Sequence, residues 1–232
     1  MDSPSTAASA YTVLASDAEI ITEIERKKSR FLTVMRRAES SDRAHQLVDD
    51  LRRTHPTARH HCSAWVIGAD RRIQRANDDG EPSGTAGAPM LEALVKASMP
   101  SGREDLSDVV VVVVRWFGGT LLGAGGLVSA YSDSVIAALE SAGASGAFRR
   151  HQRLRQYSLL APIAEAGRWE NELRSTGVSV LNTDYGKIPG NAALTLAIPD
   201  EMDQANQLAA KTAAVSSGTA SLEELGTAWV DL

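Results

Sequence analysis

Six consecutive valines, Val109 to Val114, constrain the fold of this chain more than any other segment. An unbroken run of β-branched residues is typical of a central strand that is buried on both faces. The run continues as Arg-Trp-Phe and then breaks into a loop that holds five glycines within residues 118–126. Apolar residues recur with a helical period after this loop, at Leu127, Tyr131, Val135 and Leu139. The sequence therefore predicts a central strand over 109–117, a tight loop and then a helix.

Residues 77–91 form a second informative segment, which reads Asn-Asp-Asp-Gly-Glu-Pro-Ser-Gly-Thr-Ala-Gly-Ala-Pro-Met-Leu. Gly, Pro and Ser are too dense here for regular structure, so we expect a turn that carries Asp78, Asp79 and Glu81. Short loops with several carboxylates suit Mg²⁺ or acid/base chemistry. The alternative is architectural: Arg115, near the end of the central strand, is a natural counter-charge that pairs with one of these carboxylates by charge-assisted hydrogen bonds.

These two segments resemble the YigZ/IMPACT family, whose pattern is DDGEPSGTAG-x-PML, a hydrophobic strand, R-[YF]-FGG and LG-x-GGL-x-RAY. One departure is Ser129, which stands where the family pattern has an arginine. The resemblance implies a two-domain α+β fold. It also implies that the motif residues around the acidic turn are Asp78, Asp79, Glu81, Ser83, Thr85 and Arg115, and because the family shares this arginine we favour the architectural pair. Eukaryotic members resemble regulators that compete for a ribosome-associated activator of the kinase that acts on initiation factor two.

The chain has 232 residues, enough for one large or two small domains. A Ser/Thr/Ala-rich stretch predicts a loose N-terminal tail over 1–16. The Gly/Ala/Ser segment 143–146 is the best domain boundary, which gives domains over 17–146 and 147–232. The second domain shows the strand-helix-strand-strand-helix-strand order of a ferredoxin-like fold. The resemblance implies that the first is a two-layer α+β domain of the ribosomal-protein, elongation-factor and GHMP-kinase type.

One cysteine, Cys62, excludes an internal disulfide and points to a reducing compartment. The first residues lack the pattern of a signal peptide, and no apolar run is long enough to cross a bilayer. We therefore expect a cytoplasmic protein without a membrane partner. His55, His60, His61 and Cys62 lack the second ligand pair of a zinc site, so neither a metal nor a cofactor is expected.

The glycine loop is a candidate anion site, because a strand that leads through glycines into a helix presents free backbone N–H groups at a positive helix end. Its members are Gly118, Gly119, Gly123, Gly125 and Gly126. It matches neither the P-loop nor the dinucleotide-binding spacing. Close packing of the helix on the sheet, where only glycine fits, is the other explanation, and both stay open.

The formal net charge of −5 argues against a surface that is basic throughout. Two segments, 26–37 and 147–155, nevertheless carry basic residues and no acid. They supply the candidate RNA-binding residues Arg26, Lys27, Lys28, Arg30, Arg36, Arg37, Arg149, Arg150, Arg153 and Arg155. The same charges also fit an ordinary solvated strand surface.

We expect a non-enzymatic binding protein, associated with translation, that contacts RNA, the ribosome or a translation-linked protein. The alternative from another class is a phosphate- or nucleotide-binding enzyme, a phosphotransferase or hydrolase that uses the glycine loop and the acidic turn. The residues favour binding, because no nucleophile stands beside an evident base. The sequence does not indicate an oligomeric state.

Overall fold

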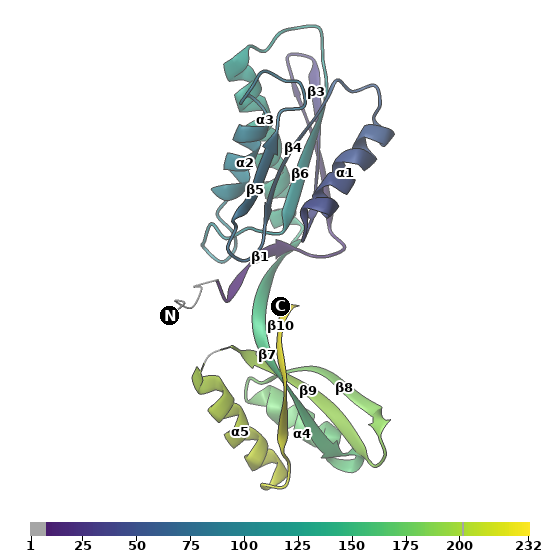
Figure 1. Cartoon of the computed structure of the whole chain (residues 1–232), viewed down its shortest axis with the longest axis vertical. Helices are drawn as coiled ribbons and strands as arrows, with labels where there is room; N and C mark the ends of the chain where they lie inside the picture. Colours follow the sequence, from purple (N-terminus) through teal and green to yellow (C-terminus); the bar gives the residue numbers. More distant parts are fainter. Residues whose placement is uncertain (1–7, 201) are drawn as a thin grey trace. The chain divides into compact units, whose positions relative to one another are not determined.

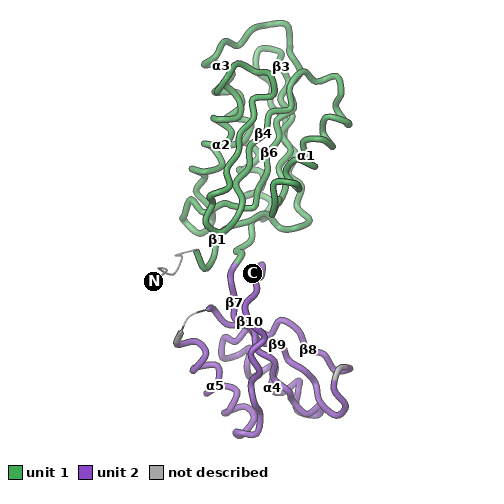
Figure 2. The backbone as a smooth tube through the Cα atoms, viewed as in Figure 1, with its two compact units in different colours: residues 1–151 green, residues 152–232 purple. Residues whose placement is uncertain are grey.

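The computed structural model describes residues 8–200 and 202–232, and it divides into two compact units, residues 1–151 and 152–232 (Figure 2). The α+β fold class expected from the sequence is confirmed. The sequence placed the boundary after residue 146, whereas the units divide after residue 151, within strand β7 (Phe148–Pro162). In the described part of the chain, no helix combines the length and the apolar character that crossing a membrane requires.

A five-stranded antiparallel sheet in the order β2-β3-β6-β4-β5 forms the centre of unit 1 (Figure 1). Its strands are β2 (Glu19–Arg26), β3 (Ser29–Arg37), β4 (His60–Ile67), β5 (Ile73–Asn77) and β6 (Val109–Trp116). The valine run lies in β6, the middle strand, and all six valines are at most 1% exposed. Side chains alternate between the faces of a strand, so this burial requires a covering layer on each face.

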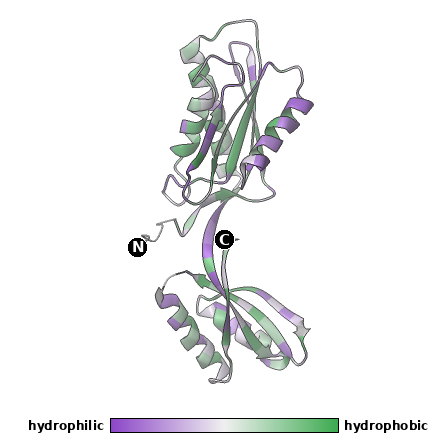
Figure 3. Ribbon diagram, viewed as in Figure 1, coloured by the Kyte–Doolittle hydropathy of each residue, from purple (hydrophilic) through white to green (hydrophobic). Residues whose placement is uncertain are grey.

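Helices cover both faces of this sheet. The larger core lies under α2 (Gly87–Val95) and α3 (Ala124–Ala144), where Val109, Val111 and Val113 point. The other face, with Val110 and Val112, packs against α1 (Ser41–Thr54). Figure 3 shows β6 as a hydrophobic strand between these helices. The expected two-layer arrangement is therefore corrected to three layers, because α1 covers the face that a two-layer domain would leave open.

The expected loose tail over 1–16 is wrong for its second half. Residues Ala10–Leu14 form strand β1, and all five are buried. Tyr11 donates a hydrogen bond to Asp108 at 2.5 Å, and the Ala15 N–H donates to the carbonyl of Ala147 at 2.8 Å. Buried apolar side chains and hydrogen bonds to residues distant in the sequence thus stabilise a strand in a segment whose composition suggests disorder. Residues 1–7 of the expected tail lie outside the described part.

Unit 2 has the strand-helix-strand-strand-helix-strand order predicted from the sequence. After β7 come α4 (Ile163–Ser175), β8 (Ser179–Ile188), β9 (Asn191–Pro199), α5 (Met202–Ser216) and β10 (Leu222–Asp231). β9 lies between β7 and β8, and β10 pairs with β7. Leu159, Leu194, Leu196 and Trp169 pack in its core, which is separate from the cores of unit 1. This order is that of a ferredoxin-like fold.

Candidate functional site

Asp78 anchors the acidic turn to the first turn of α2. Its Oδ1 accepts hydrogen bonds from the N–H groups of Ala86 and Gly87 at 3.0 and 2.8 Å, and its Oδ2 accepts one from Gly84 at 2.8 Å. Because no side chain at the N-cap of α2 takes these donors, Asp78 caps the helix from outside. Burial raises the pKa of Asp78, but the three N–H groups together outweigh it, so the pKa lies below its ordinary value.

Asp79 joins the turn to the start of β4 and to α1. Its Oδ2 accepts from the backbone N–H of His61 at 2.6 Å, and its Oδ1 accepts from Arg52 at 2.7 Å. The carbonyl of Asp79 accepts from Nδ1 of His60 at 2.9 Å. Burial lowers the pKa of His61, although the charge of Asp79 opposes this shift. Both carboxylate oxygens of Asp79 therefore already hold protein donors.

Glu81 is the buried member of the acidic turn. Nη1 of Arg115 donates to its Oε1 at 2.5 Å, and the two side chains are 6% and 4% exposed. The Tyr131 hydroxyl donates to the same oxygen at 2.7 Å, and Nε2 of His60 lies 3.8 Å from it. Nη2 of Arg115 donates to Oγ of Ser29 at 3.3 Å. Of the three acidic side chains in the turn, this is the one with which Arg115 pairs.

Cys62 and Tyr131 extend this network into the core. The thiol of Cys62 donates to the Asp78 carbonyl at 3.0 Å and lies 3.3 Å from the Tyr131 hydroxyl. Both side chains are fully buried, and burial raises the pKa of each well above its ordinary value. A protonated thiol without access to solvent is a packing group, not a nucleophile.

The two hydroxyl residues of the turn differ in their surroundings. Thr85 is buried, and its Oγ1 donates to the carbonyl of Pro82 at 2.6 Å, which closes the turn before α2. Ser83 is exposed. Sequence reasoning missed Tyr131 and Ser29 as members of this network. Tyr131 lies within the family motif, which was a usable signal, whereas nothing in the sequence marks Ser29.

Three glycines shape the loop between β6 and α3. A Cβ atom on Gly118 would lie 2.0 Å from the backbone carbon and oxygen of Lys28, so only glycine fits beside the β2–β3 turn. Gly119 and Gly123 have φ values of +86° and +78°, in the region that favours glycine. The close approach at Gly118 is thus to a neighbouring hairpin and not to α3.

The other two glycines begin α3. A Cβ atom on Gly125 would meet no atom within 4 Å, whereas one on Gly126 would lie 3.1 Å from Cβ of Leu122. Close packing of the helix on the sheet therefore does not explain Gly125. α3 has no side-chain cap and no acidic residue in its first turn. Its first N–H groups have no acceptor among the described residues, apart from Leu127, which donates to Gly123.

The acidic turn and the glycine loop meet at one pocket of about 420 Å³. It lies in unit 1, and both apolar and charged side chains line it. The lining residues are Arg59, His60, Gly80, Glu81, Pro82, Arg115, Phe117, Leu121, Leu122, Gly123, Ala124 and Leu127. The structure thus brings together two motifs that are about 40 residues apart in the sequence. We call this the loop pocket.

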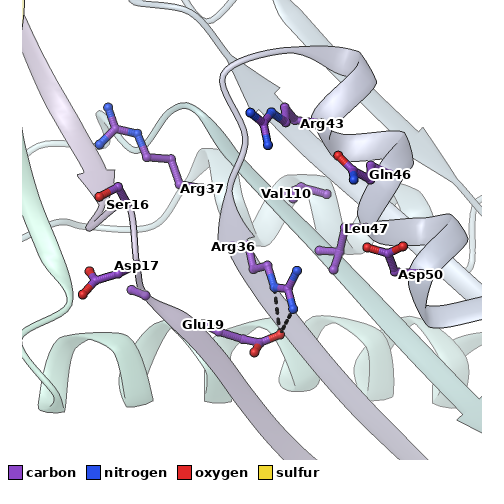
Figure 4. A pocket seen from close by; sticks show the side chains of 11 residues that line it. Ser16, Asp17, Glu19, Arg36, Arg37, Arg43, Gln46, Leu47, Asp50 and Val110 are labelled. Atoms are coloured by element: carbon purple, nitrogen blue, oxygen red, sulfur yellow. Dashed lines mark hydrogen bonds and ion pairs between the residues drawn. The ribbon is translucent and has the colours of Figure 1, made fainter. Parts of the chain in front are cut away.

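Most of the basic residues predicted to contact RNA are paired. Six of the ten lie within ion-pair distance of a carboxylate: Arg26 with Asp133, Arg30 with Glu23, Arg36 with Glu19, Arg37 with Glu39, and Arg153 and Arg155 with Asp200. The inference from acid-free segments is corrected here, because the acids come from neighbouring strands and loops and, for Asp133, from helix α3. Figure 4 shows Arg36 bound to Glu19 in a pocket that three arginines and three carboxylates line.

The remaining candidates are less neutralised. Arg149 donates to the backbone carbonyls of Gly146 and Phe148. Lys27 and Lys28 form the exposed tip between β2 and β3, with φ values of 46° and 66°. Neither these lysines nor Arg150 has a carboxylate partner in the part of the chain that the structure describes.

One end of the unit 1 sheet gathers exposed cations and aromatic rings. Register pairs Arg30 with Trp116, and the guanidinium carbon of Arg30 lies 3.9 Å from the centre of the Trp116 ring. The exposed Arg59 precedes β4, and its N–H donates to the carbonyl of Arg115 at 3.1 Å. Phe117, which is 38% exposed, follows β6. We call Lys27, Lys28, Arg30, Arg59, Trp116 and Phe117 the basic sheet end.

No group of three His, Cys, Asp or Glu side chains among the described residues is arranged to hold a metal ion. In the acidic turn, the carboxylate oxygens of Asp78 and Asp79 already accept hydrogen bonds from backbone N–H groups and from Arg52. A cation would need these oxygens as ligands.

Comparisons with known proteins point to one family. Residues 27–139 match the model of the Impact N-terminal domain. The IMPACT family member YvyE of Bacillus subtilis is 43% identical over 165 residues, which cover 71% of each chain. The IMPACT family member YigZ of Escherichia coli is 38% identical over 177 residues, which cover 75% of this chain and 80% of the relative.

A solved structure, described as the crystal structure of an hypothetical protein, has 35% sequence identity and a TM-score of 0.56. The match covers 92% of this chain and 96% of that one, so it includes residues of both units. The identity and the coverage of these relatives show that this chain belongs to the IMPACT family.

Proposed function

We propose that this protein is a non-enzymatic, cytoplasmic binding protein that contacts RNA through the basic sheet end in a translation-associated role. The observation that carries the proposal is the pair of exposed lysines, Lys27 and Lys28, which lack carboxylate partners among the described residues at the tip of the β2–β3 hairpin. Gly118 packs against the backbone of Lys28, so the tip is held beside the end of β6. The link to translation rests on the resemblance to the family's eukaryotic regulators.

The chemistry of this surface suits single-stranded RNA. Unpaired lysines attract phosphates, while aromatic rings and guanidinium groups offer surfaces on which bases stack. Arg30 is placed for stacking by Trp116, and its ion pair with Glu23, at 3.8 Å with both side chains about half exposed, contributes little. Arg59 adds a further exposed cation to the same end of the sheet.

A catalytic function has less support. The residues that line the loop pocket include no Ser, Thr, Cys or Lys within the described part of the chain, so a nucleophile of these types is missing there. Cys62 lies behind the acidic turn, fully buried and protonated. The buried carboxylate of Glu81 is bonded to Arg115 and Tyr131, which gives it an architectural role.

Titration of a labelled single-stranded RNA with the intact protein at low salt tests the proposal. We expect saturable binding in the micromolar range that weakens as salt rises, because phosphate contacts release counterions. The variant Lys27→Gln, Lys28→Gln, Arg59→Gln should bind at least tenfold more weakly. Its salt slope should flatten by about 0.7 for each phosphate that the protein no longer neutralises.

The matched control is Arg72→Gln, Arg75→Gln, Arg103→Gln, which removes the same charge from exposed residues outside the basic sheet end. This control should bind as the unaltered protein does. An equal loss in both variants would show binding by net charge alone and would overturn the assignment of the surface. If the intact protein does not bind RNA, the proposed contact is wrong, and a translation-linked protein is the remaining expected partner.

A further inference from the structure

The loop pocket has the size and lining of a small-molecule site. Its volume of about 420 Å³ lies in the range of ligand pockets, which runs from about 300 to 1,000 Å³. Phe117, Leu121, Leu122 and Leu127 give it an apolar wall, and Leu121 is 82% exposed. Leu121 and the neighbouring ring of Phe117 thus provide apolar surface that a planar group can cover.

The start of α3 in this pocket favours an anion. The first turn of α3, a helix of 21 residues, faces the pocket at Gly123 and Ala124 without a side-chain cap. Free N–H groups and the helix dipole attract negative charge at such an end. Arg59 also lines the pocket and has no carboxylate partner among the described residues. No acidic residue lies in this first turn to satisfy the N–H groups from within the chain.

A second, independent observation is the hydrogen bonding of Glu81, which lines the pocket and whose side chain is 4% exposed. The contacts to Glu81 from Arg115, Tyr131 and His60 are all to Oε1. Oε2 has no donor among the described residues, so it is left to accept from a ligand. Arg115 itself is bonded through Nη1 to Glu81 and through Nη2 to Ser29, and its Nε is covered by protein atoms.

The required ligand therefore combines an anionic group, a planar apolar part and hydroxyl or amino donors. An inorganic phosphate would leave the apolar wall uncovered, and an apolar peptide side chain would leave Arg59, Oε2 of Glu81 and the N–H groups unpaired. Ribose and base supply hydroxyl and amino donors, and a nucleotide carries all three features. We propose that the loop pocket binds one nucleotide of RNA, with its phosphate at the first turn of α3 and Arg59 and its base on Phe117 and Leu121. This inference rests on the proposed RNA contact and assigns it a specific subsite.

Calorimetric titration of the intact protein with adenosine and uridine 5′-monophosphates tests the proposal directly. Adenosine, uridine and inorganic phosphate are titrated separately. We expect saturable binding of the monophosphates at least tenfold tighter than binding of phosphate or of either nucleoside. Equal binding of phosphate and monophosphate would show a simple anion site and overturn the nucleotide assignment.

The decisive variant is Ala124→Glu, which places a carboxylate in the first turn of α3. A negative charge is favourable at that end of a helix, so this variant should fold as well as the unaltered protein. Nucleotide binding should fall at least tenfold. Ser129→Glu, an exposed position on the same helix that does not line the pocket, adds the same charge and should leave binding unchanged. Unchanged binding in Ala124→Glu would refute the subsite.

The two proposals fail in different ways. If the intact protein binds RNA but no monophosphate, the pocket assignment is wrong and the RNA contact at the basic sheet end stands. If it binds monophosphates and the Ala124→Glu variant does not, but no RNA binds, the pocket is a site for free nucleotides and the RNA function is wrong. If both bind and both weaken in Ala124→Glu, both proposals are supported.

Discussion

Arg115 donates a hydrogen bond to Oε1 of Glu81, and this buried ion pair joins the end of β6 to the acidic turn. The further polar contacts of the two side chains reach three other elements. Glu81 contacts Tyr131 in α3 and His60 in β4, and Arg115 contacts Ser29 in β3. The turn is therefore held from three further elements at once. Its shape, and with it the shape of the loop pocket, depends on this charge pair together with the contacts of Asp78 and Asp79.

Removal of one partner should expose this dependence. Arg115→Ala leaves a buried carboxylate without its counter-charge, and we expect a loss of about 3–5 kcal/mol in the free energy of unfolding. Urea denaturation measures it. Lys96→Ala, which breaks the exposed pair with Glu92, is the control and should change stability by less than about 1 kcal/mol. Equal stability of Arg115→Ala and the unaltered protein would show that the pair contributes nothing.

Replacement of both partners should restore much of the stability. In Glu81→Gln with Arg115→Met, no charge remains buried, and the amide oxygen still accepts from Tyr131. We expect the double variant to be more stable than Arg115→Ala alone. A double variant that is less stable would indicate that Arg115 acts mainly by packing, for example against Phe31, whose ring centre is 5.3 Å from its guanidinium carbon.

Asp78 should make the turn sensitive to acid. Its pKa is lower in the folded protein than in the unfolded chain, so its contribution is complete above about pH 4. As the pH falls through the lowered folded pKa, this contribution disappears. Asp78→Asn cannot ionise, so its stability deficit relative to the unaltered protein should shrink between pH 5 and about pH 2. A deficit that is constant across this range would show that the charge of Asp78 does not stabilise α2.

The elements of the fold were largely predictable from the sequence, while the partners of surface charges were not. The valine run locates β6 at Val109–Trp116, within one residue of the predicted strand over 109–117. The start of β7 at Phe148 was not readable from the sequence, because Arg149 and Arg150 extend the strand without an apolar pattern. β1 was missed, since five residues in a Ser/Thr/Ala-rich segment give too weak a periodic signal.

There is a physical reason why the arrangement of the site was less predictable from the sequence than the fold. Ion pairs such as Arg36 with Glu19 join strands that are adjacent in space but not in the local sequence, so an acid-free segment does not indicate free charge. The meeting of the acidic turn with the glycine loop is likewise a product of sheet order, because β4 and β6 are neighbours. Only the family motif indicated that these two segments act together.

The buried β1 should contribute to the stability of unit 1. Val13 is fully buried, and Val13→Ala removes two methyl groups from a packed site, which should cost roughly 2 kcal/mol of unfolding free energy. Ile21, which is 57% exposed on β2, is the control, and Ile21→Ala should have a much smaller effect. Thermal and urea unfolding measure both. Equal, small effects at the two positions would indicate that residues 10–14 form the loose tail that their composition suggests.

The glycine loop offers the sharpest pair of substitutions. Gly118→Ala would bring a Cβ atom to 2.0 Å from backbone atoms of Lys28, so the hairpin or the loop must move, and we expect a destabilisation of several kcal/mol. Gly125→Ala meets no atom within 4 Å in the first turn of α3, where alanine favours the helix by about 0.5–1 kcal/mol. The two variants should therefore move the melting temperature in opposite directions.

The same two variants separate the effect of loop shape on monophosphate binding from that of electrostatics, because neither substitution changes charge. Gly118→Ala should weaken binding. Gly125→Ala should leave binding within about twofold if the phosphate stays clear of the added methyl group. A Gly118→Ala variant as stable as the unaltered protein would contradict the close approach of the loop to the β2–β3 turn.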